Sequence, residues 1–272
     1  MASFDEQVAT ARAPEPAPAA SPPVWRTPLL WRVLLLVARF LVPLFCRLRV
    51  VGGVPPRLRQ QSLILASNHI GVFDPIALTA ACARLGLSPR ILATGGLFRA
   101  TVVGSVLRRC GHLRVDRGRT SVTEALASAV AAVRAGSVVA GYPEGRITLE
   151  PGVWPERGRS GMARLALATG APVIPVSQWG AHEVMTCNSP AQMVWRLLGS
   201  VWRRPLVQVR FGPPVDLSDL SAGDSSSVRV ATDRIIAALI AGLTPLRADE
   251  PGLPRYADPT RPVTSGRAYL PR

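Results

Sequence analysis

One histidine and one aspartate stand close together after a short apolar run. His69 and Asp74 are separated by four residues, and the preceding run Ser62–Ala66 is typical of a buried strand. A carboxylate at this spacing can fold back onto one imidazole nitrogen, fix its tautomer and stabilise the imidazolium. The other nitrogen is then left to accept a proton. The pair therefore predicts a general base, His69, with its orienting acid, Asp74.

The same spacing has two purely structural explanations, which the sequence leaves open. Asp74 precedes Pro75 and so occupies a typical N-cap position of a helix, and His69 can be a structural histidine. The chain has no Gly-x-Ser-x-Gly motif and no cysteine in a nucleophilic motif. A catalytic His69 must therefore activate a hydroxyl of the substrate itself, which is acyl transfer by general base catalysis. A thioester donor suits this route because its thiolate leaves easily.

Two later segments are candidates for binding a phosphate group. In the segment 111–119, the planar guanidinium of Arg117 matches the geometry of a phosphate. The segment 142–148 follows an expected strand and carries three further candidates, Glu144, Gly145 and Arg146. A glycine there permits a ligand to approach the backbone closely. The alternatives are a solvated charge cluster for the first segment and a surface turn with an internal Glu–Arg pair for the second.

The composition indicates an anionic partner. The 272 residues include 32 basic and 17 acidic ones, every basic residue is arginine, and the formal net charge is +15. Such an excess is typical of proteins that bind nucleic acid, an anionic membrane or phosphorylated substrates. Only 6% of the residues are aromatic, too few for a base-stacking surface, which argues against nucleic acid. The four cysteines show neither C-x-x-C nor Cys/His spacing, so we expect no metal site.

From Ser62 onward, apolar runs alternate with segments of helical spacing. The expected strands are Ser62–Ala66, Arg90–Ala93, Leu113–Val115, Ser137–Gly141, Pro172–Ser177 and Leu206–Phe211. The expected helices are Pro75–Leu85, Thr101–Arg109, Ser121–Arg134, Ser160–Ala168 and Ser226–Leu243. This alternation predicts a single α/β domain with a mixed, mostly parallel sheet flanked by helices. Its strands deliver the candidate residues to their carboxyl ends, where such sheets usually bind ligands.

The chain divides into four expected regions. Residues 1–23 are rich in alanine and proline and are expected to be a disordered tail. Residues 24–61 carry seven arginines and no acidic residue. The α/β domain is expected to span residues 62–246, and the proline-rich residues 247–272 to form a second tail.

The apolar run Pro28–Cys46 favours an amphipathic helix in the headgroup layer of a membrane. Arg32 and Arg39 are seven residues apart and share one helical face, and an arginine inside a spanning helix costs about 2.5–3.5 kcal/mol. An interfacial helix avoids this cost. A helix packed on the protein's own core and a true span are the alternatives. We therefore expect residues 24–61 to be a basic membrane-docking segment.

A cluster rich in tryptophan and arginine lies between the last two expected strands. Its members are Trp195, Arg196, Trp202, Arg203 and Arg204. The cluster is expected either to contact lipid or the phosphates of an acyl donor, or to belong to a helix that packs its tryptophans inward.

Four blocks of the chain, taken in order, resemble the glycerolipid acyltransferase family, in particular bacterial 1-acyl-sn-glycerol-3-phosphate acyltransferases. The blocks are Asn68-His69 with Asp74, Gly111 to Arg117, Tyr142-Pro143-Glu144-Gly145, and Ala171 to Val176. The resemblance implies that His69 is the general base on a lysophospholipid hydroxyl and that Asp74 orients it. The substrate-binding set that it implies comprises Asn68, Arg117, Glu144, Gly145 and Arg146. The chain departs from the family at Arg146-Ile147-Thr148, where Thr-Arg-Ser is usual, and at Tyr142, where phenylalanine is usual.

The expected activity is that of a membrane-associated O-acyltransferase. It would move a fatty acyl chain from acyl-CoA or acyl-carrier protein to 1-acylglycerol-3-phosphate, giving phosphatidic acid, with no cofactor besides this co-substrate. The expected location is the cytoplasmic face of the cell membrane, as a peripheral or monotopic protein. The alternatives are the same mechanism on another lysophospholipid, a glycolipid or a natural-product acceptor, and a non-catalytic basic membrane-binding protein.

Overall fold

The computed structural model describes residues 25–116, 119–150, 152–185 and 190–247, and their strands form one sheet. The strands are β1 (Arg47–Gly52), β2 (Leu63–Ser67), β3 (Arg90–Thr94), β4 (Leu113–Val115), β5 (Val138–Gly141), β6 (Val173–Trp179) and β7 (Leu206–Phe211). Their order is β1-β7-β6-β2-β5-β3-β4, and every neighbouring pair is parallel except β6 with β7. The predicted mixed, mostly parallel sheet is confirmed.

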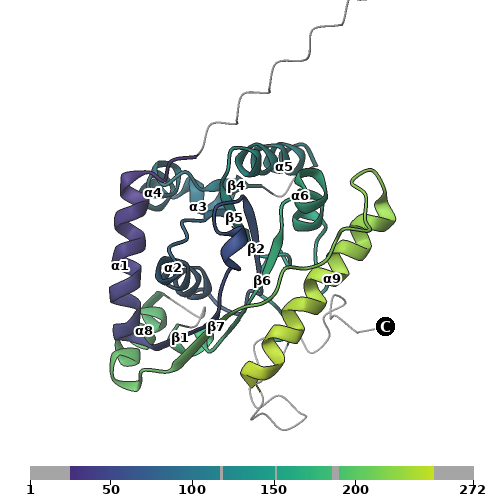
Figure 1. Cartoon of the computed structure of the whole chain (residues 1–272). Helices are drawn as coiled ribbons and strands as arrows, with labels where there is room; N and C mark the ends of the chain where they lie inside the picture. Colours follow the sequence, from purple (N-terminus) through teal and green to yellow (C-terminus); the bar gives the residue numbers. More distant parts are fainter. Residues whose placement is uncertain (1–24, 117–118, 151, 186–189, 248–272) are drawn as a thin grey trace, which may run out of the picture.

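Helices cover both faces of this sheet. They are α1 (Leu29–Phe45), α2 (Asp74–Arg84), α3 (Gly95–Arg99), α4 (Thr101–Arg109), α5 (Arg119–Arg134), α6 (Gly161–Thr169), α7 (Ala181–Val184), α8 (Pro190–Arg203) and α9 (Ser225–Leu243), with the 3-10 turns η1 (Pro56–Leu58) and η2 (Thr244–Arg247). Figure 1 shows α1 and α2 on one side of the sheet and α5, α6 and α9 on the other. The fold is therefore a three-layer α/β arrangement.

The central strand β2 explains why this fold forms. All five of its side chains are buried. Leu63 and Leu65 pack into the apolar cluster on the α1 and α2 side, whereas Ile64 and Ala66 pack into the cluster on the α6 and α9 side. Successive side chains of a strand point to opposite faces, so a strand covered on both faces needs a continuous apolar run. The residue that follows such a strand emerges at a fixed place, the carboxyl edge of the sheet.

The expected boundary at residue 62 lies too late in the chain. Strand β1 falls inside the segment 24–61 and pairs in parallel with β7, with Arg47 opposite Leu206. Its alternation of arginine with apolar residues is typical of an edge strand, which charged side chains protect from further pairing. The α/β domain therefore includes β1, and the segment 24–61 is not a separate unit.

Helix α1 has two apolar faces with different surroundings. Trp31, Leu35 and Val42 are buried against the rest of the protein, and the Trp31 indole donates to the carbonyl of Pro89 at 3.1 Å. The outward face exposes seven large apolar residues: Leu29, Val33, Leu36, Val37, Phe40, Leu41 and Leu44. One face is thus that of a core helix, and the other keeps the apolar character of the expected interfacial helix. No helix in the described parts of the chain has both the length and the hydropathy to cross a membrane.

The structured C-terminal region extends to Arg247, which the sequence assigned to a tail. The Arg247 guanidinium lies over the rings of Trp154 and Trp179, at 4.1 and 4.0 Å from their centroids, and the residue is buried. A cation between two aromatic faces gains favourable electrostatic contact. The remainder of both expected tails, residues 1–23 and 248–272, lies outside the described residues.

Candidate active site

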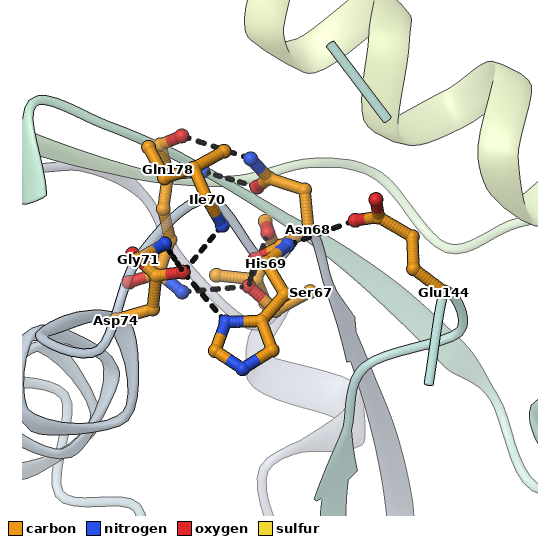
Figure 2. A network of polar contacts seen from close by, with 9 residues as sticks. Ser67, Asn68, His69, Ile70, Gly71, Asp74, Glu144 and Gln178 are labelled. Carbon is orange, nitrogen blue, oxygen red and sulfur yellow. Dashed lines mark hydrogen bonds and ion pairs between the residues drawn. The ribbon is translucent and has the colours of Figure 1, made fainter. Parts of the chain in front are cut away.

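The predicted base and acid meet in the loop between β2 and α2. His69 Nδ1 lies 2.8 Å from Asp74 Oδ2, and the Asp74 carboxylate is fully buried. The same oxygen accepts hydrogen bonds from the backbone N–H groups of Ile70 at 2.6 Å and Gly71 at 2.8 Å (Figure 2). Three donors on one oxygen fix the carboxylate, and the carboxylate in turn fixes the imidazole.

The structure differs from the N-cap explanation for Asp74. The helix begins at Asp74 itself, and Phe73 is the N-cap residue with no side-chain capping bond. The Asp74 oxygen instead faces backward, to the loop that carries His69. A loop of four residues is short enough for this return, so the local chain geometry places the carboxylate on the imidazole.

The second nitrogen of the imidazole faces away from this network. The His69 side chain is 17% exposed, and its ring stacks on that of Tyr142 with centroids 4.1 Å apart. Figure 2 shows the far edge of the ring pointing away from Asp74. Within the described residues no hydrogen bond to Nε2 is found. Nδ1–H donating to a carboxylate leaves Nε2 as the acceptor, so this nitrogen can take a proton from a substrate.

Asn68, a predicted substrate-binding residue, links β2 to β6 just beyond their last backbone pair. Its amide nitrogen donates to the Gln178 carbonyl at 3.0 Å, and its amide oxygen accepts from the Gln178 N–H at 2.7 Å. The last ladder pair before this contact is Ser67 with Val176. Because the Asn68 side chain is fully buried, its function in the structure is to hold β2 to β6 beside His69.

Glu144, a second predicted substrate-binding residue, also contacts the backbone. One carboxyl oxygen accepts from the His69 N–H at 2.8 Å, and the other accepts from the Glu156 N–H at 3.1 Å. The backbone carbonyl of His69 accepts a hydrogen bond from the N–H of Thr148 at 2.7 Å. The loop after β5 therefore holds both polar groups of the His69 backbone. Complete burial raises the pKa of Glu144 to about 8, although the two N–H donors act in the opposite direction.

Arg146 forms an internal ion pair. Its Nε and Nη2 atoms each lie 2.9 Å from an oxygen of Glu156, a bidentate arrangement, and the Glu156 side chain is fully buried. Two parallel hydrogen bonds to a buried carboxylate make this the strongest kind of Arg–Glu contact. The guanidinium is thereby committed to the loop 142–159. Arg117, the other predicted phosphate ligand, lies outside the described residues.

Gly145 is needed for packing of the chain itself. Its φ is +70°, and a Cβ added there would lie 2.8 Å from Cδ of Arg159. The Arg159 backbone N–H donates to the Pro143 carbonyl at 2.7 Å, which fastens this residue to the loop after β5. Arg159 is an exposed arginine beside the site that was not among the residues predicted from the sequence. The feature that points to Arg159 is its contact with Gly145, and this contact is seen only in the folded structure.

Asp116, directly after β4, packs against Gly95 at the start of α3. Asp116 pairs with Arg114 at 2.6 Å and lies 3.9 Å from Arg99. Its carboxylate occupies the space where a side chain on Gly95 would be, since a Cβ there would lie 1.6 Å from Oδ1. The glycine thus makes room for an acid that neutralises two nearby arginines.

Comparison with known proteins agrees with this fold. Residues 49–179 match the family model described as Acyltransferase. The crystal structure of the 1-acyl-sn-glycerophosphate (LPA) acyltransferase PlsC from Thermotoga maritima is similar, with a TM-score of 0.58 and 18% identity over 81% of each chain. At that identity the likeness shows the fold.

Curated relatives occur in mycobacteria. An uncharacterized protein of Mycobacterium tuberculosis is 28% identical over 68% of this chain and 58% of its own length. An uncharacterized protein of Mycobacterium leprae is 25% identical over 68% of this chain and 56% of its own length. The chain thus spans less than two thirds of the length of these relatives.

Proposed function

We propose that the protein is an O-acyltransferase that moves a fatty acyl chain from a thioester, acyl-CoA or acyl-carrier protein, to the free hydroxyl of a lysophospholipid. The observation that carries this proposal is the contact of His69 with the buried Asp74, which leaves Nε2 at the open edge of the ring. It is supported by the match to the Acyltransferase family model, which covers both residues.

The proposed reaction needs one proton transfer in each direction. His69 Nε2 accepts the proton of the acceptor hydroxyl while its oxygen attacks the thioester carbonyl carbon. The tetrahedral intermediate then breaks its C–S bond, and the leaving thiolate takes the proton from the imidazolium to give the thiol. Asp74 stabilises the imidazolium between these two steps, because its carboxylate is fixed on Nδ1. The products are the new ester and the free thiol.

The acceptor that we propose is 1-acylglycerol-3-phosphate, with phosphatidic acid as the product. Since Arg146 is paired with Glu156, the phosphate would contact Arg159 and Arg117 instead. Arg159 is exposed, and its stem lies against Gly145, next to the residue that holds His69. A guanidinium offers two parallel hydrogen bonds to a phosphate.

We also propose a peripheral location on the cytoplasmic face of the membrane, as expected from the sequence. The seven exposed apolar residues of α1 support it, because a soluble monomer rarely keeps a continuous apolar patch of this kind in water. A lysophospholipid acceptor also resides in the membrane.

A labelled acyl-CoA incubated with a panel of acceptors tests the reaction and its substrate together. The panel holds lysophosphatidic acid, lysophosphatidylglycerol and a neutral glycolipid, and product masses identify the ester. We expect the ester of lysophosphatidic acid, and its formation should disappear in His69→Ala. Turnover that prefers the neutral glycolipid would overturn the phosphate acceptor but keep the reaction class. Absence of any ester with acyl-CoA and acyl-carrier protein alike would overturn the proposed function.

A further inference from the structure

Helix α8 has its apolar side on the outside. Its exposed large apolar residues are Val194, Trp195, Leu198, Val201 and Trp202. Their spacing of one, four, seven and eight residues after the first puts them on one face of the helix. The opposite face packs inward, where Leu197 contacts the α1 and α2 cluster and Ser200 is buried. A surface helix normally shows its polar face to solvent, so this orientation requires an explanation.

The exposure of the two tryptophans is the strongest part of this observation. Trp195 is 74% exposed and Trp202 is 83% exposed. Tryptophan is the largest side chain, and it is highly buried on average in soluble proteins. Its ring is amphipathic and is enriched where an apolar phase meets water. The two rings therefore fit the boundary region of a bilayer.

The charges around α8 match an anionic partner. Arg196, Arg203 and Arg204 are exposed, and the segment 190–211 contains no acidic residue. Basic residues near an anionic leaflet each contribute about 1 kcal/mol of attraction. Helix α8 and its C-terminal end thus carry exposed positive charge as well as an apolar face, which suits a surface that is anionic outside and apolar beneath.

Helices α1 and α8 are joined at their C-terminal ends. The guanidinium of Arg204 donates to the Pro43 carbonyl of α1 at 3.0 Å, and that of Arg47 donates to the Arg204 carbonyl at 3.2 Å. The two helices also contact one another. Their outward apolar residues therefore adjoin, and we call them together the two-helix apolar face.

This joint lies at the same edge of the sheet as His69. Strand β6 ends at Trp179, opposite Gln208, and β7 runs the other way, so β7 begins at that edge. β1 begins beside it, since Arg47 pairs with Leu206. The C-terminal ends of α1 and α8, which precede β1 and β7, therefore lie at the edge where β2 delivers the imidazole.

The apolar exposure is confined to one side of the molecule. Among the side chains that the structure describes, every large exposed apolar residue lies on α1 to α4, on α8 or at the start of β7. The helices of the other layer, α5, α6 and α9, contribute none within those limits. Figure 1 shows α1, α4 and α8 on one side of the sheet and α9 on the opposite side.

From these observations we infer that α8 is a second lipid-binding helix. The protein docks on an anionic phospholipid bilayer with the two-helix apolar face, which brings the carboxyl edge of the sheet to the headgroup layer. This inference concerns binding and does not require acyl transfer.

The test is sedimentation of the full chain with vesicles, in the absence of acyl donor and acceptor. Wild-type protein should bind vesicles of phosphatidylglycerol mixed with phosphatidylcholine more tightly than vesicles of phosphatidylcholine alone. The double variant Trp195→Ala/Trp202→Ala should bind the anionic vesicles about tenfold or more weakly, a loss set by the apolar area removed. Both side chains are exposed, so the melting temperature should stay unchanged and show that the variant folds.

A matched pair of charge reversals isolates the contribution of position from that of net charge. Arg196→Glu lies on α8, and Arg229→Glu lies on the exposed side of α9 in the other layer. The first should weaken binding to anionic vesicles several-fold, and the second should leave it near that of the wild type. Equal effects of the two reversals would overturn the inference. Unchanged vesicle binding by the tryptophan double variant would also overturn it, whether or not that variant changes the oligomeric state of the chain.

Discussion

The candidate catalytic loop, residues 68–74 together with Glu144, which holds it, differs from the two-helix apolar face in what surrounds its side chains. At the loop, polar groups with no exposure have partners inside the protein: Asp74 has three donors, and Asn68 and Glu144 each contact two backbone groups. On the face, large apolar groups lie open on the surface. Buried polar groups need internal partners, whereas exposed apolar groups gain free energy only by leaving water. The buried groups of the loop are held mainly by contacts within the protein, whereas the apolar face gains free energy only by contact with a second phase.

The largest expected effect concerns the catalytic loop. His69→Ala should reduce kcat by about 10³-fold or more, because it removes the proposed proton acceptor. Vesicle binding should change little, since His69 does not belong to the two-helix apolar face. The melting temperature reports the stability that is lost when the buried Asp74 carboxylate loses its imidazole partner. Steady-state kinetics with detergent-dispersed acceptor measure the effect. A variant that keeps more than a tenth of the wild-type kcat would show that the base is another group.

Asp74→Asn sharpens the same comparison, because it keeps the shape of the side chain and removes its charge. The amide can no longer stabilise an imidazolium on Nδ1, so kcat should fall by about 10²-fold. The KM for the acceptor should change much less, since the Asp74 side chain is fully buried and acts through His69. An effect confined to KM would contradict the proposed role.

A third prediction compares the two faces of α1. Leu35 is 8% exposed and Phe40 is 65% exposed. Leu35→Ala should lower the free energy of unfolding by about 2 kcal/mol or more, and Phe40→Ala should change it by less than about 0.5 kcal/mol. Urea unfolding measures both values. Vesicle binding should respond in the reverse order, and a loss of stability in Phe40→Ala would mean that the outward face is covered within the protein.

A fourth prediction concerns the pH dependence of stability through Glu144. Its pKa is raised from an ordinary 4.5 to about 8 in the folded protein, so the folded state keeps a proton that the unfolded chain releases. The free energy of unfolding from this group therefore falls as the pH rises from about 4.5 to about 8. Glu144→Gln cannot titrate, and this decline should be absent.

The same variant has a cost that is independent of pH. Its amide oxygen can accept from one backbone N–H, but its amide nitrogen then faces the other, which should lower stability by about 1 kcal/mol. Urea unfolding of both proteins across the pH range measures the two effects. Parallel stability curves for wild type and variant would show that Glu144 is ionised throughout.

The sequence predicted the central elements because their signals are local. The run before His69 is apolar on both faces, and β2 follows it within one residue; Leu113–Val115 and Thr101–Arg109 match their strand and helix at both ends. β1 was missed because Arg47 and Arg49 break the apolar pattern of a strand that needs only one inward face. The tryptophan and arginine cluster did not reveal which side of α8 faces outward, since both orientations fit one amphipathic pattern.

The candidate site was predictable to the extent that its contacts are close in sequence. The contact of His69 with Asp74 spans five residues and follows from a short loop. The partners of Arg146 and Glu144 depend on Glu156, which a separate turn of the chain returns to the loop after β5. No pattern in the segment 142–148 indicates that return. Glu144 and Arg146 therefore have partners that their own segment does not reveal.

Arg247 has a practical consequence for shortened versions of the chain. Its guanidinium is held between Trp154, in the loop after β5, and Trp179, at the end of β6, so one side chain near the C-terminus ties together two segments that flank the catalytic loop. A truncation after residue 247 keeps the contact of Arg247 with the two tryptophans, whereas a truncation after residue 246 removes it. The indole rings of Trp154 and Trp179 would then lose their cover, and Trp179 is next to Gln178, the hydrogen-bond partner of Asn68.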